Sequence, residues 1–158
     1  MVPTDVDEVT EGDPETVVIE NARRKARAAG ARSEATCLGA DTEVVLDERV
    51  LGKPADAAQA REYLEALSGR THEVLTGVVV AGPDGERSGH ARSQVTFRHL
   101  DPATIDRYIE SGEWRDRAGA YAIQGLGSIL VARLEGDFSN VVGLPVPLLI
   151  DLAPQLFR

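Results

Sequence analysis

The stretch GADTEVVLDERVLGKP, residues 39–54, holds an acid near its start and a lysine near its end. Apolar residues lead into this stretch and stop at Asp41, so we predict one strand over residues 35–39 and a second over 43–51. An acidic turn inside the second segment makes that segment a hairpin. Such a hairpin could fold back and bring the Asp41 carboxylate near the Lys53 ammonium.

The rest of the chain mixes helix and strand signals in no regular order. Helix signals predict four helices, from Pro14 to Gly30, after Pro54 as far as Gly69, from Pro102 to Gly112 and from Pro145 to Phe157. Runs of strand-forming residues predict three further strands, over residues 71–81, 86–98 and 128–134. The segment 114–144 is otherwise rich in glycine and irregular, as in loops that line a site. These elements indicate an α/β or α+β fold with a mixed sheet.

Length and composition restrict the class of protein. With 158 residues the chain is most simply one domain, residues 1–158. A formal net charge of −9 argues against sequence-independent binding of nucleic acid, which depends on Lys and Arg neutralising phosphates. No stretch approaches the ~20 apolar residues of a membrane span, and the acidic N-terminus lacks the features of a signal peptide. We therefore expect a soluble, cytoplasmic protein with no nucleic-acid or membrane partner.

Two residues of the quoted stretch are candidates for chemistry, and each has a plainer alternative. Asp41 stands where the predicted strand ends, a place where reactive groups often lie. Alternatively, its carboxylate only ends the strand by hydrogen bonding to the backbone. The proline after Lys53 restricts the Lys53 backbone to an extended conformation, so its ammonium could be directed at an anion. Alternatively, Lys53 is a solvated surface residue, as most lysines are. The spacing of the two residues does not decide between these alternatives.

Other charged residues offer weaker signals. Glu8 lies in an acidic run that could supply a metal ligand or could simply be solvated. Lys25 lies at the edge of the apolar face of the first predicted helix, from which it could point into a cleft or to the surface. The three histidines have no metal-binding spacing, and the sequence contains no Ser-His-Asp arrangement and no phosphate-binding P-loop. Because the chain is acidic and has no P-loop, an anionic ligand would have to be bound by a metal ion that carboxylates hold, or by a few local basic groups.

Six ordered blocks carry a family resemblance over nearly the whole chain: G-A-D-T (39–42), G-K-P (52–54), L-S-G-R-T-H-E-V-x-T-G (67–77), V-T-F-R (95–98), A-G-A-Y-A-I-Q-G (118–125) and N-V-V-G-L-P (140–145). In order and spacing these blocks resemble the Maf family of nucleoside triphosphate pyrophosphatases. The resemblance implies an α/β fold in which helices flank a mixed, twisted sheet with a deep central cleft. It also implies hydrolysis of a nucleoside triphosphate to the monophosphate and pyrophosphate, with a divalent cation such as Mg²⁺, Mn²⁺ or Co²⁺.

The resemblance also implies roles for the charged candidates. Asp41 matches the proposed proton acceptor for the attacking water and would touch the metal. Glu8 matches an acid at the metal site. Lys53 and Lys25 match basic residues that neutralise phosphate charge, as a substrate with four negative charges requires.

Thr42 and Gln124 match positions that the family links to base specificity. The form A-Y-x-I-Q-G resembles the branch that acts on dTTP and UTP, and not the branch that acts on 7-methylguanosine triphosphate. A glutamine amide is both donor and acceptor, which suits a pyrimidine edge that carries a carbonyl and an N–H. The resemblance implies a biological role in removing noncanonical nucleotides, with modified pyrimidine triphosphates as further substrates. The family also suggests a homodimer.

The family normally begins with a strand and a loop of the form S-x-S-P-R-R, which contacts the triphosphate. This sequence starts after that segment, so we expect an N-terminally truncated form of the fold whose natural protein begins upstream. Two alternatives to an active enzyme stay open. One is a non-catalytic regulator of septum formation in cell division, and the other is an inactive truncated fragment.

Overall fold

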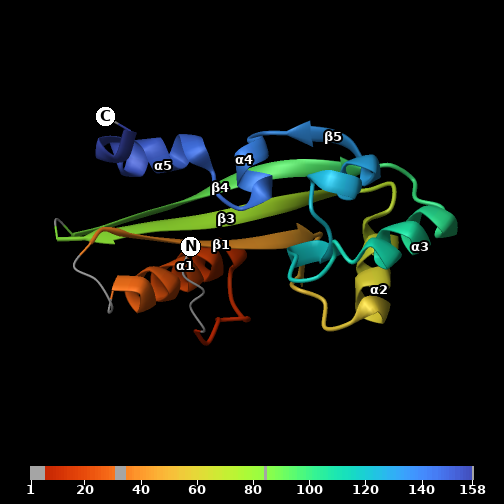
Figure 1. Ribbon diagram of the computed structural model, residues 1–158, viewed down its shortest axis with the longest axis horizontal. Coiled ribbons are helices and arrows are strands. Elements are labelled where there is room, and N and C mark those ends of the chain that lie inside the picture. The colour runs from red at the N-terminus through yellow and green to blue at the C-terminus, as the bar shows by residue number, and fades with distance from the viewer. Residues whose placement is uncertain (1–5, 31–34, 84, 158) are drawn as a thin grey trace. The chain divides into compact units, whose positions relative to one another are not determined.

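The computed structural model describes residues 6–30, 35–83 and 85–157, and it forms one sheet of five strands flanked by helices (Figure 1). The strands are β1 (Cys37–Leu46), β2 (Arg49–Leu51), β3 (Thr71–Gly82), β4 (Gly85–Phe97) and β5 (Val131–Glu135). Their order across the sheet is β2-β1-β3-β4-β5. The predicted α/β class is confirmed, but the sheet is antiparallel and not mixed.

Short connections explain why β1 lies antiparallel to β2 and β3 antiparallel to β4. Asp47 begins the turn between β1 and β2 with a left-handed φ of 55°. Gly85, with a φ of 107°, ends the turn between β3 and β4, and Asp84 of that predicted turn lies outside the described residues. Connections of a few residues can join only antiparallel neighbours, because parallel strands need a long crossover.

The helices are α1 (Pro14–Gly30), α2 (Ala57–Leu67), α3 (Pro102–Ser111), α4 (Phe138–Val142) and α5 (Val146–Leu152), with 3₁₀ turns η1 (Ala118–Ala120), η2 (Gly125–Leu130) and η3 (Pro154–Phe157). The first three confirm the predictions, and each begins at an aspartate whose carboxylate accepts a backbone N–H: Asp13, Asp56 and Asp101. The last predicted helix breaks at Ala153, because Pro154 has no N–H to continue it. Over the described ranges, no helix is long and apolar enough to span a bilayer.

The chain divides into two compact units. The first unit comprises Met1–Thr42, Leu75–Ala91 and Ser139–Arg158, and the second comprises Glu43–Val74 and Arg92–Phe138. Strands β1, β3 and β4 each contribute residues to both units. A single domain over residues 1–158 stays a prediction.

In the first unit, α1 packs directly on the sheet through small residues. Ala22 and Ala26 are fully buried against Val79 of β3. Gly39 of β1 allows this approach, because a Cβ there would lie 2.0 Å from the carbonyl oxygen of Ala22. Gly77 of β3 has the same function beside the backbone of α1. The two glycines bring the helix backbone against the strands, which positions the polar side chains of α1 over β1.

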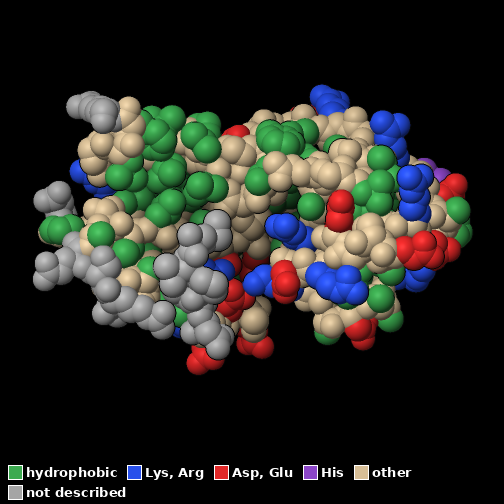
Figure 2. Space-filling view, in the orientation of Figure 1, with side chains coloured by type: hydrophobic (Ala, Val, Ile, Leu, Met, Phe, Trp, Pro, Cys, Tyr) green, Lys and Arg blue, Asp and Glu red, His purple; other side chains and the backbone are tan. Residues whose placement is uncertain are grey.

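The first unit also packs α5 on the sheet, through other residues of β3. Val78 and Val80 form a cluster with Leu149 and Ala153. Because side chains alternate along a strand, these valines face away from α1. The outer side of α5 and η3 exposes the apolar residues Val146, Ile150, Leu156 and Phe157, which we call the C-terminal patch. Figure 2 shows hydrophobic side chains gathered over this part of the chain.

In the second unit, the predicted apolar face of α2 is buried and packs near α3 and η1. An aromatic cluster of His72, Phe97 and Tyr121 lies in the same unit, with edge-on ring contacts of 4.8–5.5 Å between centroids. The Nε2 of His72 is 2.8 Å from the Tyr121 hydroxyl. Burial lowers the pKa of His72 to about 4, so this ring is neutral at neutral pH.

Candidate active site

Asp41 lies inside β1, and the prediction that a strand ends at this residue is wrong. The strand continues to Leu46, and the Asp41 side chain is only 9% exposed. A carboxylate that competed for the backbone would interrupt the strand. Both oxygens of Asp41 are instead held by α1: Oδ1 by Lys25 at 2.5 Å and Oδ2 by the amide of Asn21 at 3.1 Å. The strand therefore tolerates a buried acid.

The Lys25 ammonium bridges two carboxylates. Its Nζ lies 2.5 Å from Oδ1 of Asp41 and 2.8 Å from Oε1 of Glu8. Burial alone would lower the pKa of Lys25, but the hydrogen bonds to Asp41 and then Glu8 outweigh it and hold the pKa above its ordinary value. The first unit thus brings together three residues proposed from the sequence: Glu8, Lys25 and Asp41.

Asn21 is a residue that the sequence analysis missed. Its amide accepts from the backbone N–H of Val9 at 2.7 Å and donates to the Val9 carbonyl at 3.0 Å. The same amide nitrogen donates to Asp41, so Asn21 ties the segment that carries Glu8 to the catalytic candidate. The signal was a polar residue between Val18 and Ala22 on the apolar face of α1, where a buried amide needs partners.

Thr42 makes contacts distinct from those of Asp41. Its hydroxyl lies 2.8 Å from the hydroxyl of Thr76, which donates to the backbone carbonyl of Asn140 at 3.0 Å. Because a hydroxyl has one proton, Thr42 is the donor to Thr76 and keeps only acceptor lone pairs for other partners. Adjacent strand residues point to opposite faces, so Asp41 faces α1 and Thr42 faces α4.

Lys53 and Gln124 belong to the second unit. The carbonyl of Gly52 accepts a hydrogen bond from the N–H of Gly119 at 3.2 Å, so the turn that carries Lys53 lies against η1. Gln124 follows η1 along the chain, and both Lys53 and Gln124 are exposed. The second unit therefore gathers these two candidates on adjoining segments.

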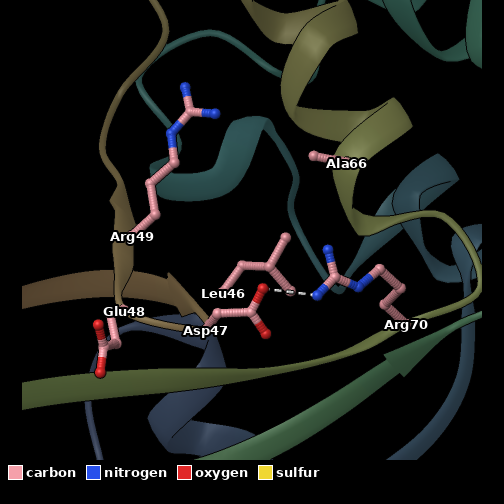
Figure 3. Close-up of a pocket in the computed structure, with 6 residues that line it drawn as sticks. All are labelled: Leu46, Asp47, Glu48, Arg49, Ala66 and Arg70. Atoms are coloured by element: carbon pink, nitrogen blue, oxygen red, sulfur yellow. Dashed lines mark hydrogen bonds and ion pairs between the residues drawn. The ribbon is translucent and has the colours of Figure 1, made fainter.

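A surface pocket of about 660 Å³ in the second unit is separate from these candidates (Figure 3). Asp47 and Arg70 point toward one another across it and form an ion pair of 2.7 Å. Arg49 forms an ion pair with Glu62. Three of the four charged residues that line the pocket thus pair within the protein.

The first unit fits one mode of divalent-cation binding. The described residues include no group of three or more His, Cys, Asp or Glu that could hold a metal, so a complete protein cage is absent among them. However, Mg²⁺ is commonly held by one or two carboxylates together with water and substrate phosphates. Glu8 and Asp41, which share the Lys25 ammonium, supply two such carboxylates. The donor set therefore fits a cation that arrives with a phosphate ligand.

Comparison with known proteins decides the family. A family model described as "Maf-like protein" matches residues 1–156. The chain belongs to the Maf-like family. This Maf-like protein is 44% identical to a protein of Deinococcus radiodurans over 96% of the chain and 78% of the relative. It is 44% identical to one of Thermococcus gammatolerans over 96% of the chain and 82% of the relative. Each of the two relatives is named dTTP/UTP pyrophosphatase.

A third relative, from Moorella thermoacetica, is 55% identical over 79% of the Maf-like chain and 65% of its own length. It carries the same name, dTTP/UTP pyrophosphatase. The family expected from the six sequence blocks is thereby confirmed.

Proposed function

We propose that this Maf-like protein hydrolyses dTTP and UTP to the monophosphate and pyrophosphate. The names of its relatives support this substrate class. The observation that carries the proposal is the cluster in the first unit, where a buried carboxylate, Asp41, is held by Lys25 and Asn21. Such a cluster combines a group that can take a proton with a cation that can meet phosphate charge.

In the proposed reaction, Asp41 accepts a proton from the attacking water. The water oxygen bonds to the α-phosphorus, and the bond from that phosphorus to the bridging oxygen breaks, so pyrophosphate leaves with the electron pair. Asn21 holds Oδ2 of Asp41, which limits the rotation of the carboxylate. A general base must lie within hydrogen-bond reach of its proton, and a fixed carboxylate meets that need at the lowest entropic cost.

Lys25 and Lys53 are the proposed phosphate ligands. Lys25 is half-buried beside Asp41, where its charge is less screened than in water. Lys53 is exposed at the turn after β2. Positive groups stabilise the charge that moves toward the leaving pyrophosphate, and no side-chain nucleophile is needed.

Glu8 and Asp41 would hold a divalent cation, with Mg²⁺, Mn²⁺ and Co²⁺ as candidates. When bound, such an ion neutralises phosphate charge and polarises the phosphoryl oxygens. Lys25 contacts both carboxylates, so its ammonium would compete with the cation for their oxygens.

Thr42 and Gln124 are the proposed base-reading residues. The lone pairs of the Thr42 hydroxyl suit a ring N–H of uracil or thymine, since its own proton goes to Thr76. The Gln124 amide can donate to a ring carbonyl. Cytosine places a lone pair where uracil has its N–H, so an acceptor at that point disfavours CTP.

The test is pyrophosphate release from dTTP, UTP and 7-methylguanosine triphosphate, with Mg²⁺ or Mn²⁺. We expect release from dTTP and UTP, and a loss of at least roughly a hundredfold in kcat for Asp41→Asn. Asp47→Asn is the matched control, because Asp47 is an exposed acid in the second unit. Full turnover by Asp41→Asn, or release only from 7-methylguanosine triphosphate, would refute the proposal.

We also propose that the protein acts in the cytoplasm as a homodimer. The C-terminal patch supports the dimer, because contiguous exposed apolar residues mark interaction surfaces. Sedimentation of the wild type and of Ile150→Glu tests it: a dimer that the substitution splits supports the patch as the interface, and a wild-type monomer contradicts it.

A further inference from the structure

Gln124 stands at the tip of a tight loop in the second unit. The chain folds back so closely that a Cβ on Gly127 would lie 1.9 Å from the carbonyl oxygen of Ala122. Gln124 lies between these two residues and is exposed. The loop therefore presents one polar side chain from a compact base.

Glu113 holds the C-terminal side of this loop. Its carboxylate accepts hydrogen bonds from the backbone N–H groups of Leu126, at 3.0 Å, and Gly127, at 3.1 Å. Gly125 has a φ of 64°, and a Cβ there would lie 2.7 Å from Oε1 of Glu113. Hydrogen bonds from neutral donors to a charged carboxylate are among the stronger ones in proteins.

Tyr108 holds the N-terminal side. Its hydroxyl accepts a hydrogen bond from the N–H of Ala122 at 3.1 Å, and the side chain is fully buried on α3. Tyr121, the residue before, bonds through its hydroxyl to His72. Both sides of the loop are thus anchored to buried or half-buried groups of the second unit.

Glu113 is itself fixed by the end of α3. Its backbone N–H donates to the hydroxyl of Ser111 at 3.2 Å, and that hydroxyl donates to the carbonyl of Tyr108 at 2.6 Å. Gly112 ends the helix in the left-handed conformation, which turns the chain toward the loop. The position of Glu113 therefore follows from the helix end.

We propose that Glu113 is a positioning residue for base recognition, which acts by fixing the backbone around Gln124. This inference rests on the proposed function. A glutamine side chain is long and its amide can present either a donor or an acceptor, so a loose loop would let it adapt to both uracil and cytosine. A fixed loop restricts the reach of the amide and lowers the entropy lost when the base binds.

The test substitutes Glu113→Gln and compares kcat/KM for UTP with kcat/KM for CTP. The variant places an amide NH₂ where the carboxylate accepted a backbone N–H, so the clamp loses a hydrogen bond. We expect kcat/KM for UTP to fall roughly tenfold, mainly through a higher KM. The ratio of kcat/KM for UTP to kcat/KM for CTP should therefore decrease. Asp101→Asn is the matched control: it also replaces a carboxylate that accepts a backbone N–H by an amide, but at the N-cap of α3 and not at the loop. Because the asparagine oxygen can still accept the N–H of Thr104, this control should keep the ratio of kcat/KM for UTP to kcat/KM for CTP.

A double-mutant cycle with Gln124→Ala separates positioning from general stability. If Glu113 acts through Gln124, the double variant Glu113→Gln/Gln124→Ala should have the same UTP-to-CTP ratio of kcat/KM as the single variant Gln124→Ala. Amide hydrogen exchange at residues 126 and 127 should speed up in Glu113→Gln. The inference would be overturned if the two substitutions change the UTP-to-CTP ratio of kcat/KM additively, or if Glu113→Gln alone leaves that ratio unchanged.

Failure of the proposed function would look different. If the wild type releases no pyrophosphate from any triphosphate, that function fails. The same variants are then compared by their Kd for UTP and CTP, where an equal Kd ratio in wild type and Glu113→Gln overturns the positioning role.

Discussion

The ammonium of Lys25 lies 2.5 Å from Oδ1 of Asp41 and 2.8 Å from Oε1 of Glu8, so one cation bridges two carboxylates in the first unit and leaves the three groups with a net charge of about −1. Their partial burial strengthens both ion pairs, because side chains that are 21%, 9% and 36% exposed are only partly screened by water. The ammonium and a divalent cation would seek the same oxygens, and this competition can be measured.

Lys25→Met should make the stability of the protein depend more strongly on Mg²⁺. Loss of the ammonium leaves two carboxylates that repel each other, so we expect the free energy of unfolding to fall by about 2 kcal/mol without metal. Mg²⁺ should restore part of this loss and raise the melting temperature more than it does for the wild type. Lys53→Met, which changes an exposed lysine of the second unit, is the control. An equal Mg²⁺ response in Lys25→Met and wild type would argue against the two-carboxylate site.

Asn21→Leu should release the N-terminal segment. The substitution removes the amide that pairs with the backbone of Val9 and donates to Asp41, and the expected cost is about 2–3 kcal/mol of unfolding free energy. Limited proteolysis should then cut near Glu8 at a concentration of protease that leaves the wild type intact. Protection equal to that of the wild type would show that Asn21 does not hold this segment.

Gly39→Ala should separate α1 from β1. Its new Cβ would lie 2.0 Å from the carbonyl oxygen of Ala22, which is backbone and cannot rotate away. We expect a loss of about 3 kcal/mol in urea unfolding, and reduced turnover because Lys25 moves with the helix. Gly52→Ala is the control, since a Cβ there meets nothing within 4 Å. Equal stability of the two variants would contradict the close packing.

His72 should make the protein sensitive to acid. Its pKa is about 4 in the folded protein against an ordinary 6.5, so the unfolded chain binds the proton first as the pH falls. The free energy of unfolding should therefore decrease between pH 6.5 and about 4, by roughly 3 kcal/mol from this group. His72→Phe should lack this component of the slope, whereas His99→Asn, at an exposed position, should keep it. The result is checked by urea unfolding at several pH values, and a slope unchanged in His72→Phe would disprove it.

Local signals predicted the elements whose cause is local. Asp13, Asp56 and Asp101 each cap a helix within three residues of their own position, and these three helices were predicted. The break of β1 at Asp41 was predicted wrongly, because the partners that satisfy this acid lie 16 and 20 residues earlier in the chain.

In the candidate site, too, the residues were predicted from the sequence but some of their partners were not. Glu8, Lys25 and Asp41 were each proposed from the sequence, and the structure brings the three together. Asn21, which orders them, was missed because an asparagine on a helix carries no motif. Glu113 was missed for a similar reason, since its two backbone partners follow it by 13 and 14 residues in a segment expected to be irregular.

The sequence by itself determined the family, the α/β class, the three capped helices and the identity of the charged candidates. Those features depend on short motifs, and a motif acts through neighbours along the chain. Only the tertiary structure decided that β1 runs through Asp41, that Lys25 bridges two acids, and that Glu113 clamps the loop of Gln124. These outcomes depend on the close approach of distant backbone, as at Gly39 and Gly127, where the absence of a Cβ lets two segments touch.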